Sequence, residues 1–561
     1  MADKQKAFVC LPMCHKESSQ QNTLLSCSER QEQALYSRMA RLLTLLMGAL
    51  LLGVAQCELF TAIAHMEGLL GLESELLTSL NSYITREKDR IQQLESFADQ
   101  VSGIHNLMDE VDPTSHLHNP VNSLHLVGRF TNNWGNLADL VYQDNSHDLM
   151  ANLSVNNYRL PTQEDFNGAM TAVMRLQDTY DLQPHELASG NLGKEKSLSM
   201  DALDCYRVGR LAYEEKNWKK ARDWMKEALH KFEDGGDVDL VSIYDHLSFS
   251  EYSIGNLKRA AGYNKDLLQN EPNHERALSN MAYFNTLKDE KPDDFIDQEI
   301  PMNEDDRLEM SEREIYEATC REGRPYPTEI ERKLTCFYYN GGNNPRLIIQ
   351  PVKVEVVYLD PRIYILRGIV SDREIERLKE LGGPVLKRAT ARNWKSQQFE
   401  PVKYRISKSG WLSPADDDQG YLVKIDQRIE DFTGLTMETA EQLQVCNYGI
   451  GGHYEPHYDF ARNDEDAFTS LGTGNRMATV LFYISAVERG GATVFTELGL
   501  RIAPSKGDAT FWWNLKKSGE GDLRTRHAGC PVLVGSKWVC NKWIHERGQE
   551  FRRQCDLNKN L

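Results

Sequence analysis

Apolar residues recur three and four positions apart along the first long segment of the chain. The pattern starts at Leu59 and continues through Ile63, Met66, Leu70, Leu77, Leu80, Ile84, Ile91, Leu94 and Ala98. This heptad-like spacing predicts an amphipathic helix, with gaps in the pattern at Glu73 and Glu87. The apolar stripe can pack on the core of its own domain or form a coiled coil with a second chain. We expect dimerisation, and packing within the domain is the alternative.

A second helical pattern occupies residues 200 to 287. The segments NWKKARDWMKEAL, from Asn217, and NLKRAAGYNKDLL, from Asn256, align with one another and resemble tetratricopeptide repeats. Such helix pairs form a concave groove. The region is rich in aromatic residues: Tyr206, Tyr213, Trp218, Trp224, Tyr244, Phe249, Tyr252, Tyr263 and Tyr283. Core packing is the ordinary use of any one of them, but an aromatic surface also suits a proline-rich, extended peptide.

From about residue 345 the pattern changes to short strands. LQVCNYG, MATVLFYISA, GATVFTELGLRIAP, DATFWWNL, CPVLVG and KWVCNKWIHE are rich in β-branched and aromatic residues and are separated by turn residues. This pattern predicts an antiparallel barrel or jelly roll. The acidic stretch 288–312 before it is interpreted as a linker. The fold class is therefore multidomain α + β, because helical segments precede a sheet domain.

An apolar run at residues 42–55 has the length of a signal-peptide core and follows Arg38 and Arg41. Met39 would begin an ordinary signal peptide, so we interpret residues 1–38 as an upstream extension. Cleavage is expected near Glu58, which leaves no membrane segment in the mature chain. A retained signal anchor is the alternative.

Net charge and cysteine content limit which kinds of partner and metal site are expected. The chain of 561 residues has a net charge of -18, which argues against nucleic acid or an anionic membrane and favours a neutral or basic macromolecule. Seven of the 11 cysteines follow the predicted cleavage site and none forms a CxxC pair, so a zinc site is not expected. Asn152 begins the sequon NLS and is a candidate glycan acceptor.

The stretch GGHYEPHYDF, residues 451–460, contains two His-x-carboxylate pairs: His453 with Glu455, and His457 with Asp459. Residues two apart in a strand share a face, so either pair could present two ligands to one metal. Downstream, RTRHAGCPVLVGSKWV supplies His527 and Lys537. Two histidines and a carboxylate form the facial triad of Fe(II) oxygenases, which leaves positions open for a 2-oxo acid and O2.

Four motifs make the resemblance specific: YEPHYDFA, GGATVFTELG, RHAGCPVLVGSKWVCNKWIHERGQEFRR and, upstream, RLQDTYDLQPHELASGNL. In order and spacing they resemble the alpha subunits of collagen prolyl 4-hydroxylases. The resemblance implies that His457, Asp459 and His527 bind iron, that Lys537 pairs with the 2-oxoglutarate carboxylate, and that Tyr448 and His545 line or orient the co-substrate site. His453 and Glu455 are then expected to be solvated loop residues, not ligands.

The resemblance also implies a domain order and a disulfide pattern. The expected segments are 1–57, extension plus signal peptide; 58–165, helical dimerisation domain; 166–290, peptide-substrate domain with Tyr213, Tyr252 and Tyr283 as contacts; 291–345, linker with a disulfide; and 346–561, catalytic jelly roll with its core at about 439–547. The implied disulfides are Cys320 with Cys336 and Cys530 with Cys555. Cys205, Cys446 and Cys540 would remain thiols.

The implied reaction is 4-hydroxylation of proline in X-Pro-Gly of procollagen or other proline-rich chains, coupled to decarboxylation of 2-oxoglutarate on Fe(II). O2 is consumed and L-ascorbate keeps the iron reduced. The family forms α2β2 tetramers with protein disulfide isomerase in the endoplasmic reticulum lumen. A lysyl or oxygen-sensing hydroxylase, or a collagen-binding chaperone with an inactive barrel, is the alternative. His246 and Phe249 replace family tyrosines, and we expect weaker poly(L-proline) binding, especially at acidic pH.

Overall fold

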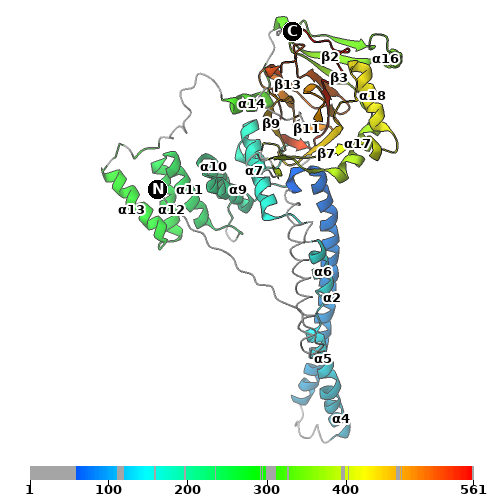
Figure 1. Ribbon diagram of the computed structural model, residues 1–561. Helices are drawn as coiled ribbons and strands as arrows, with labels where there is room; N and C mark the ends of the chain where they lie inside the picture. Colours follow the sequence, from blue (N-terminus) through cyan, green and yellow to red (C-terminus); the bar gives the residue numbers. More distant parts are fainter. Residues whose placement is uncertain are drawn as a thin grey trace, which may run out of the picture. The chain divides into compact units, whose positions relative to one another are not determined.

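The computed structural model describes residues 59–109, 119–156, 160–194, 197–233, 236–290, 292–293, 295–297, 311–324, 328–392, 399–401, 404–462, 468 and 471–558 (Figure 1). The predicted extension and signal peptide lie outside the described residues. Within the described part of the chain, no helix combines the length and hydropathy needed to cross a membrane.

The predicted heptad segment forms one long helix, α2 (Ile63–Asp109). The helices that follow it are α4 (Pro120–Gly128), the π-helical turn η3 (Arg129–Asn133), α5 (Trp134–Tyr142) and α6 (His147–Asn156). Helix α5 packs on α2 through an edge-to-face contact of Trp134 with Phe97 at 5.2 Å. Much of the apolar stripe remains open, since Leu70, Leu77 and Ile91 are 70, 55 and 47% exposed. Dimerisation through this stripe stays a prediction.

Between Gln163 and Glu290, the described residues form the helices of the region predicted to contain helical hairpins. They are α7 (Gln163–Tyr180), α8 (Pro184–Ala188), α9 (Ala202–Glu214), α10 (Trp218–His230), α11 (Leu240–Ile254), α12 (Leu257–Asn270) and α13 (Glu275–Glu290). Polar residues cap the starts, for example Asp201 on α9 and Asn217 on α10, whose side chains accept from backbone N–H groups. Trp224 is fully buried between the helices and donates to Gln177 Oε1 at 2.9 Å.

The C-terminal part is a two-sheet structure. The larger sheet has the strand order β1-β2-β3-β14-β10-β17-β8-β7-β4, and the smaller has the order β13-β12-β15-β9. The larger sheet consists of β1 (Cys336–Tyr339), β2 (Val352–Leu359), β3 (Arg362–Arg367), β4 (Lys387–Arg388), β7 (Ser407–Leu412), β8 (Leu443–Tyr448), β10 (Arg476–Tyr483), β14 (Ala509–Trp513) and β17 (Trp538–His545). The smaller sheet consists of β9 (Tyr454–His457), β12 (Thr493–Phe495), β13 (Leu500–Ile502) and β15 (His527–Gly529). The predicted α + β fold class is confirmed.

A small hydrophobic cluster surrounds Cys320 and Cys530, and two larger cores stabilise the described part of this domain. One contains Tyr483, Phe495 and Trp512 with neighbouring aliphatic residues, and the other contains side chains of helices α17 (Asp372–Gly382) and α18 (Tyr421–Thr433) against the larger sheet. Strands β11 (Val487–Gly490) and β16 (Val532–Gly535) form a separate ribbon, as do β5 (Thr390–Arg392) and β6 (Phe399–Pro401). The remaining short helices are α15 (Thr328–Glu331), α16 (Pro345–Ile349), η5 (Gly383–Val385), η6 (Pro414–Asp416) and η8 (Leu523–Thr525).

The predicted disulfide pairing is wrong. The structure joins Cys320 to Cys530, with a Cα–Cα distance of 5.7 Å, and leaves Cys336 and Cys555 as exposed thiols. Helix α14 (Glu312–Arg321) packs on the smaller sheet through Tyr316 and Cys320, whereas β1, which begins at Cys336, joins the edge of the larger sheet. Proximity in sequence therefore did not bring Cys320 and Cys336 together. Cys205, Cys446 and Cys540 are buried thiols, as expected.

The turn between β8 and β9 is held by the first described residues of the chain, η2 (Leu59–Thr61). The backbone N–H of Ile450 donates to Phe60 O at 3.0 Å, and Ala64 N–H donates to Asn447 Oδ1 at 3.0 Å. A side chain on Gly449 would begin 1.8 Å from Phe60 O, so only glycine permits this approach. The segment around Phe60 thus supports the turn that precedes the candidate metal ligands.

We predict that Leu267→Ala destabilises the helical-repeat region, because Leu267 on α12 is fully buried. Truncating a buried leucine costs about 2–5 kcal/mol. The matched control is Leu278→Ala on α13, where the side chain is 50% exposed. Hydrogen exchange measured by mass spectrometry on the full chain should show faster exchange in α12 for the first variant only. Equal protection in both variants would contradict this packing.

Candidate metal and co-substrate site

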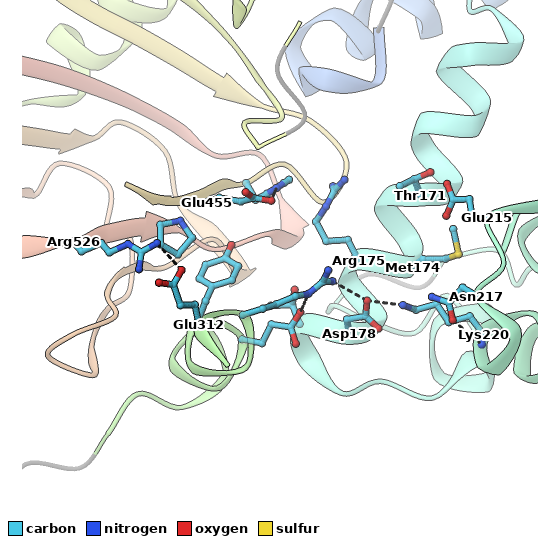
Figure 2. A pocket seen from close by; sticks show the side chains of 16 residues that line it. Thr171, Met174, Arg175, Asp178, Glu215, Asn217, Lys220, Glu312, Glu455 and Arg526 are labelled. Carbon is cyan, nitrogen blue, oxygen red and sulfur yellow. Dashed lines mark hydrogen bonds and ion pairs between the residues drawn. The ribbon is translucent and has the colours of Figure 1, made fainter. Parts of the chain in front are cut away.

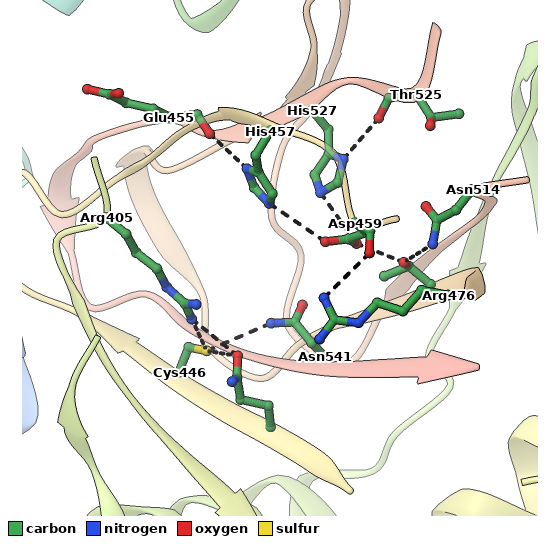
Figure 3. A network of polar contacts seen from close by, with 12 residues as sticks. Arg405, Cys446, Glu455, His457, Asp459, Arg476, Asn514, Thr525, His527 and Asn541 are labelled. Atoms are coloured by element: carbon green, nitrogen blue, oxygen red, sulfur yellow. Dashed lines mark hydrogen bonds and ion pairs between the residues drawn. The ribbon is translucent and has the colours of Figure 1, made fainter. Parts of the chain in front are cut away.

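Strand pairing brings two histidines from distant parts of the chain together. Strand β9 ends at His457 and β15 begins at His527, and the two residues lie directly opposite one another in the antiparallel register. Their ring centroids are 4.4 Å apart. Asp459, two residues beyond β9, lies with its Oδ1 3.7 Å from His457 Nε2 and its Oδ2 3.5 Å from His527 Nε2 (Figure 3).

Backbone carbonyls orient both imidazole rings. His457 Nδ1 lies 2.8 Å from Glu455 O, and His527 Nδ1 lies 3.0 Å from Thr525 O. Since a carbonyl can only accept, each Nδ1 carries the proton and donates, which leaves both Nε2 lone pairs directed at the Asp459 carboxylate. This is the tautomer that a metal requires at Nε2.

The carboxylate has its own support. Thr479 Oγ1 donates to Asp459 Oδ2 at 2.7 Å, and Asn514 Nδ2 donates in turn to Thr479 Oγ1 at 2.9 Å (Figure 3). Burial raises the pKa of Asp459, but the two neighbouring histidines and Arg476 outweigh that effect and hold its pKa below the ordinary value. Asp459 is therefore ionised at neutral pH.

The donor set fits Fe(II). One ligand atom from each of His457, Asp459 and His527 lies within 4.8 Å of the other two. Burial and the neighbouring His527 lower the pKa of His457 to about 3, so its imidazole is neutral and available as a ligand. Two neutral nitrogens and one carboxylate match the facial triad of non-haem Fe(II) enzymes, which leaves further coordination positions open.

A buried lysine lies deeper in the same barrel. Lys537 is 2% exposed, and its Nζ lies 4.9 Å from the ring centroid of Tyr448, which is also buried. Burial lowers the pKa of Lys537 to about 7, and no carboxylate pairs with it among the described residues. A buried cation without an anionic partner is costly, so this position is suited to a ligand carboxylate. The roles of Lys537 and Tyr448 in co-substrate binding stay predictions.

His545 lies in a network beside the triad instead of within it. Its Nε2 is 3.0 Å from Glu441 Oε1, and Glu441 accepts two hydrogen bonds from Arg476, the longer at 2.9 Å. Arg476 also donates to Asp459 O at 3.5 Å and stacks over Trp543 at 3.8 Å. The sequence reasoning found His545 but missed the other three residues, because an isolated Glu, Arg or Trp has no diagnostic spacing.

Arg405 is another functional candidate that the sequence reasoning missed. Its guanidinium donates to Cys446 Sγ (Figure 3), to Gln444 Oε1 and to Ser407 Oγ. It also lies 4.7 Å from the ring centroid of Tyr454. Tyr454 in turn stacks on His457 at 3.6 Å. None of the partners of Arg405 among the described residues is a carboxylate. It therefore presents a second, half-buried positive charge near the triad.

The first His-x-carboxylate pair behaves differently from the second. Glu455 has an exposed side chain, as expected, but His453 is only 3% exposed, so its prediction as a solvated loop residue is wrong. The hydrogen bond from Ile406 N–H to His453 O holds this residue under the β7 segment. Neither residue belongs to the group of ligand atoms around Asp459.

The predicted peptide contacts lie on one continuous row of rings. Tyr252 and Tyr283 are exposed, with hydroxyl oxygens 3.4 Å apart. The row continues from Tyr252 to Phe249 at 6.1 Å, to Tyr213 at 5.6 Å and to His246 at 4.7 Å between ring centroids.

Asn152, the predicted glycan acceptor, lies exposed on α6, with its Nδ2 2.6 Å from Ser79 Oγ.

Comparison with known proteins finds similarity to prolyl 4-hydroxylase alpha subunits along most of this chain. Residues 62–194 match the N-terminal region of the prolyl 4-hydroxylase alpha subunit, 202–290 match the prolyl 4-hydroxylase peptide-substrate-binding domain, and 443–545 match the 2OG-Fe(II) oxygenase superfamily. Prolyl 4-hydroxylase subunit alpha-1 of Mus musculus is 44% identical over 92% of this chain and 99% of its own length. Subunit alpha-2 of Caenorhabditis elegans is 42% identical over 92% and 96%. The 2OG complex of a viral collagen prolyl hydroxylase from Paramecium bursaria Chlorella virus-1 is 27% identical over 32% of this chain and 94% of its own, with a TM-score of 0.26.

We predict that His457→Ala abolishes Fe(II) binding, because it removes one of the three protein ligands. Loss of an outer-shell partner alone costs about 10- to 100-fold in metal affinity, so loss of the ligand should exceed that range. His453→Ala, four residues away and outside the ligand group, is the matched control and should retain metal. Anaerobic metal titration of both variants measures this. Metal loss in the His453 variant with retention in the His457 variant would overturn the assignment.

Proposed function

The chain belongs to the prolyl 4-hydroxylase alpha-subunit family, and we propose that it hydroxylates C4 of proline in X-Pro-Gly segments of collagen-like chains. The observation that carries this proposal is the triad of His457, Asp459 and His527 next to a buried lysine that lacks a carboxylate partner. Such a site has a place for a metal and a separate place for an organic anion. A purely structural metal site would need neither open coordination positions on the metal nor a buried lysine such as Lys537 beside it.

The chain's residues hold and orient the reactants. His457, Asp459 and His527 would bind Fe(II), and Lys537 would pair with the far carboxylate of 2-oxoglutarate, with Tyr448 beside it. When bound, iron and 2-oxoglutarate supply the oxidative chemistry, in which O2 is reduced, the co-substrate loses CO2 to give succinate, and one oxygen atom enters the proline. L-ascorbate is the reductant that keeps the metal ferrous. The hydrophobic inner core limits access of water to this site.

His545 is a positioning residue in this proposal. It acts through Glu441 on Arg476, whose guanidinium reaches the backbone oxygen of Asp459. Burial raises the pKa of Glu441, but the hydrogen bonds from His545 and Arg476 outweigh that effect and keep it ionised. This anion holds Arg476 over the Trp543 ring and therefore fixes one wall of the site.

The aromatic row supports the substrate assignment. Tyr213, Tyr252 and Tyr283 would contact a proline-rich chain, because an aromatic face packs on proline rings and a hydroxyl bonds the free carbonyls of a polyproline helix. Phe249 and His246 belong to the same row but lack a phenol hydroxyl. Weaker poly(L-proline) binding than in relatives with tyrosine at both positions is the expected consequence.

Assembly and location complete the proposal. The chain would form an α2β2 tetramer with protein disulfide isomerase in the endoplasmic reticulum lumen, dimerising through the exposed stripe of α2. The disulfide between Cys320 and Cys530 and the exposed sequon at Asn152 are compatible with an oxidising, glycosylating compartment. The net charge of -18 suits a neutral or basic polymer as substrate.

The proposed activity is tested with the chain co-expressed with protein disulfide isomerase. Release of CO2 from labelled 2-oxoglutarate is measured with and without a (Pro-Pro-Gly)-type peptide, and products are identified by mass spectrometry. We expect Fe(II)-dependent turnover in which each 4-hydroxyproline formed is matched by one succinate. Hydroxylation of lysine instead, or peptide binding without any turnover, would contradict the proposal.

We predict that Lys537→Ala raises the KM for 2-oxoglutarate sharply while metal binding persists. Removing one partner of a buried ion pair costs about 2–5 kcal/mol. Lys542→Ala is the matched control, because Lys542 on β17 is about equally buried but already pairs with Asp426 at 2.7 Å. Steady-state kinetics at saturating peptide distinguish the two. An unchanged KM in the Lys537 variant would show that another cation, such as Arg405, binds the co-substrate.

A further inference from the structure

A polar pocket of about 550 Å³ lies next to the candidate site (Figure 2). Its walls come from α7, from the turn between α9 and α10, from α14, and from β9 with the residue that precedes β15. Two of its lining residues flank the metal ligands in sequence: Glu455 is two residues before His457, and Arg526 directly precedes His527. The pocket therefore shares a strand with the metal site and is also bounded by helices of the peptide-substrate region.

Most of the charge in this pocket is neutralised internally. Asp178 pairs with Lys220 at 2.6 Å and with Arg313 at 3.2 Å. Arg313 also pairs with Glu317 at 2.9 Å, and Arg526 pairs with Glu312 at 2.9 Å. Arg175 donates to the backbone oxygen of Gly451 at 3.0 Å. Of the four cations that line the pocket, Lys220, Arg313 and Arg526 pair with carboxylates, whereas Arg175 keeps its positive charge in the vicinity of Glu455.

Two of the carboxylates that line the pocket are not paired with a cation. Glu455 and Glu215 are exposed and form no ion pair with lysine or arginine among the described residues. Figure 2 shows them on opposite sides of the pocket, Glu455 with the barrel and Glu215 near Lys220 and Asn217. An exposed anion beside a site that binds a polymer is a place for a cationic side chain of that polymer.

His453 supplies an independent sign of a ligand. It lines the pocket, is only 3% exposed, and its Nδ1 has no hydrogen-bond partner. Its Nε2 lies 3.9 Å from Glu455 Oε1. Buried polar atoms in native proteins are nearly always paired, so an unpaired imidazole nitrogen points to a group that is supplied from outside. A peptide N–H or C=O is such a group.

We propose that this pocket binds the substrate chain next to the target proline and accepts a lysine or arginine side chain at Glu455. The inference rests on the proposed function and adds a preference that the reaction itself does not require. Glu455 and His457 lie about 7 Å apart along β9, given about 3.3 Å per residue in a strand. A residue in the triplet adjacent to the target can therefore reach Glu455 while the proline lies at the metal.

The test compares three proline-rich peptides that carry Lys, Gln or Glu in the triplet next to one X-Pro-Gly target, each made with the substitution before or after the target. KM and kcat are measured with the co-expressed assembly, and binding is followed by fluorescence anisotropy. For at least one of the two placements, the Lys peptide should have a KM and Kd about 3- to 5-fold lower than the Glu peptide, the range of a partly exposed ion pair. The difference should shrink at high salt.

Two variants assign the preference to Glu455. In the Glu455→Gln variant, the Lys and Glu peptides should have equal KM and Kd values. In the Glu455→Lys variant, the Glu peptide should have the lower KM and Kd. Glu376→Lys is the control, since Glu376 is an exposed carboxylate on α17 outside the pocket, and the ratio should persist there. If the Glu455 variants misfold, the Glu215→Lys variant is measured instead. It should weaken the preference for peptides whose lysine lies farther from the target proline. Equal KM and Kd for all peptides in the parent enzyme would overturn the inference but leave the proposed function intact. A parent that hydroxylates none of the peptides would refute the proposed function, and its Kd values would still decide the charge preference.

Discussion

The candidate active site depends on the antiparallel pairing of β9 with β15, in which His457 lies opposite His527. This register aligns two nitrogens from residues far apart in sequence, and the turn after β9 adds Asp459. A slip of one residue would turn one of the histidines to the other face of the sheet and destroy the triad. Three nearby features therefore support the same register: the carbonyls that orient the rings, the Thr479 hydrogen bond, and the Phe60 segment behind the preceding turn.

Buried charge gives the site its chemical selectivity. Lys537 is buried and Arg405 is half-buried, and neither has a carboxylate partner among the residues that the structure describes. Each is costly to the folded chain when no ligand is present, and a dicarboxylate compensates that cost while an uncharged molecule does not. By contrast Arg476, which is held by Glu441, is already satisfied and serves to shape the wall. The difference between paired and unpaired cations thus separates binding positions from structural ones.

Much of this arrangement could be predicted from the sequence, and the failures have physical causes. The heptad spacing, the repeated helix pair and the strand-rich end were readable because each element repeats its own apolar period. The pair of His457 and Asp459 could not be preferred over that of His453 and Glu455 by spacing, since both fit a strand. Three features arise from contacts between distant segments, for which local sequence carries no signal. They are the burial of His453, the disulfide between Cys320 and Cys530, and the hydrogen-bond network around Arg476.

The central claim is that the second His-x-carboxylate pair, with His527, holds the metal while Lys537 holds the far end of 2-oxoglutarate. A crystal structure of the co-expressed assembly with Mn(II) in place of Fe(II) and with 2-oxoglutarate tests it most directly. The account predicts anomalous density within bonding distance of His457 Nε2, His527 Nε2 and one Asp459 oxygen, and a ligand carboxylate paired with Lys537 Nζ. Metal bound instead between His453 and Glu455, or a co-substrate carboxylate paired only with Arg405, would contradict it.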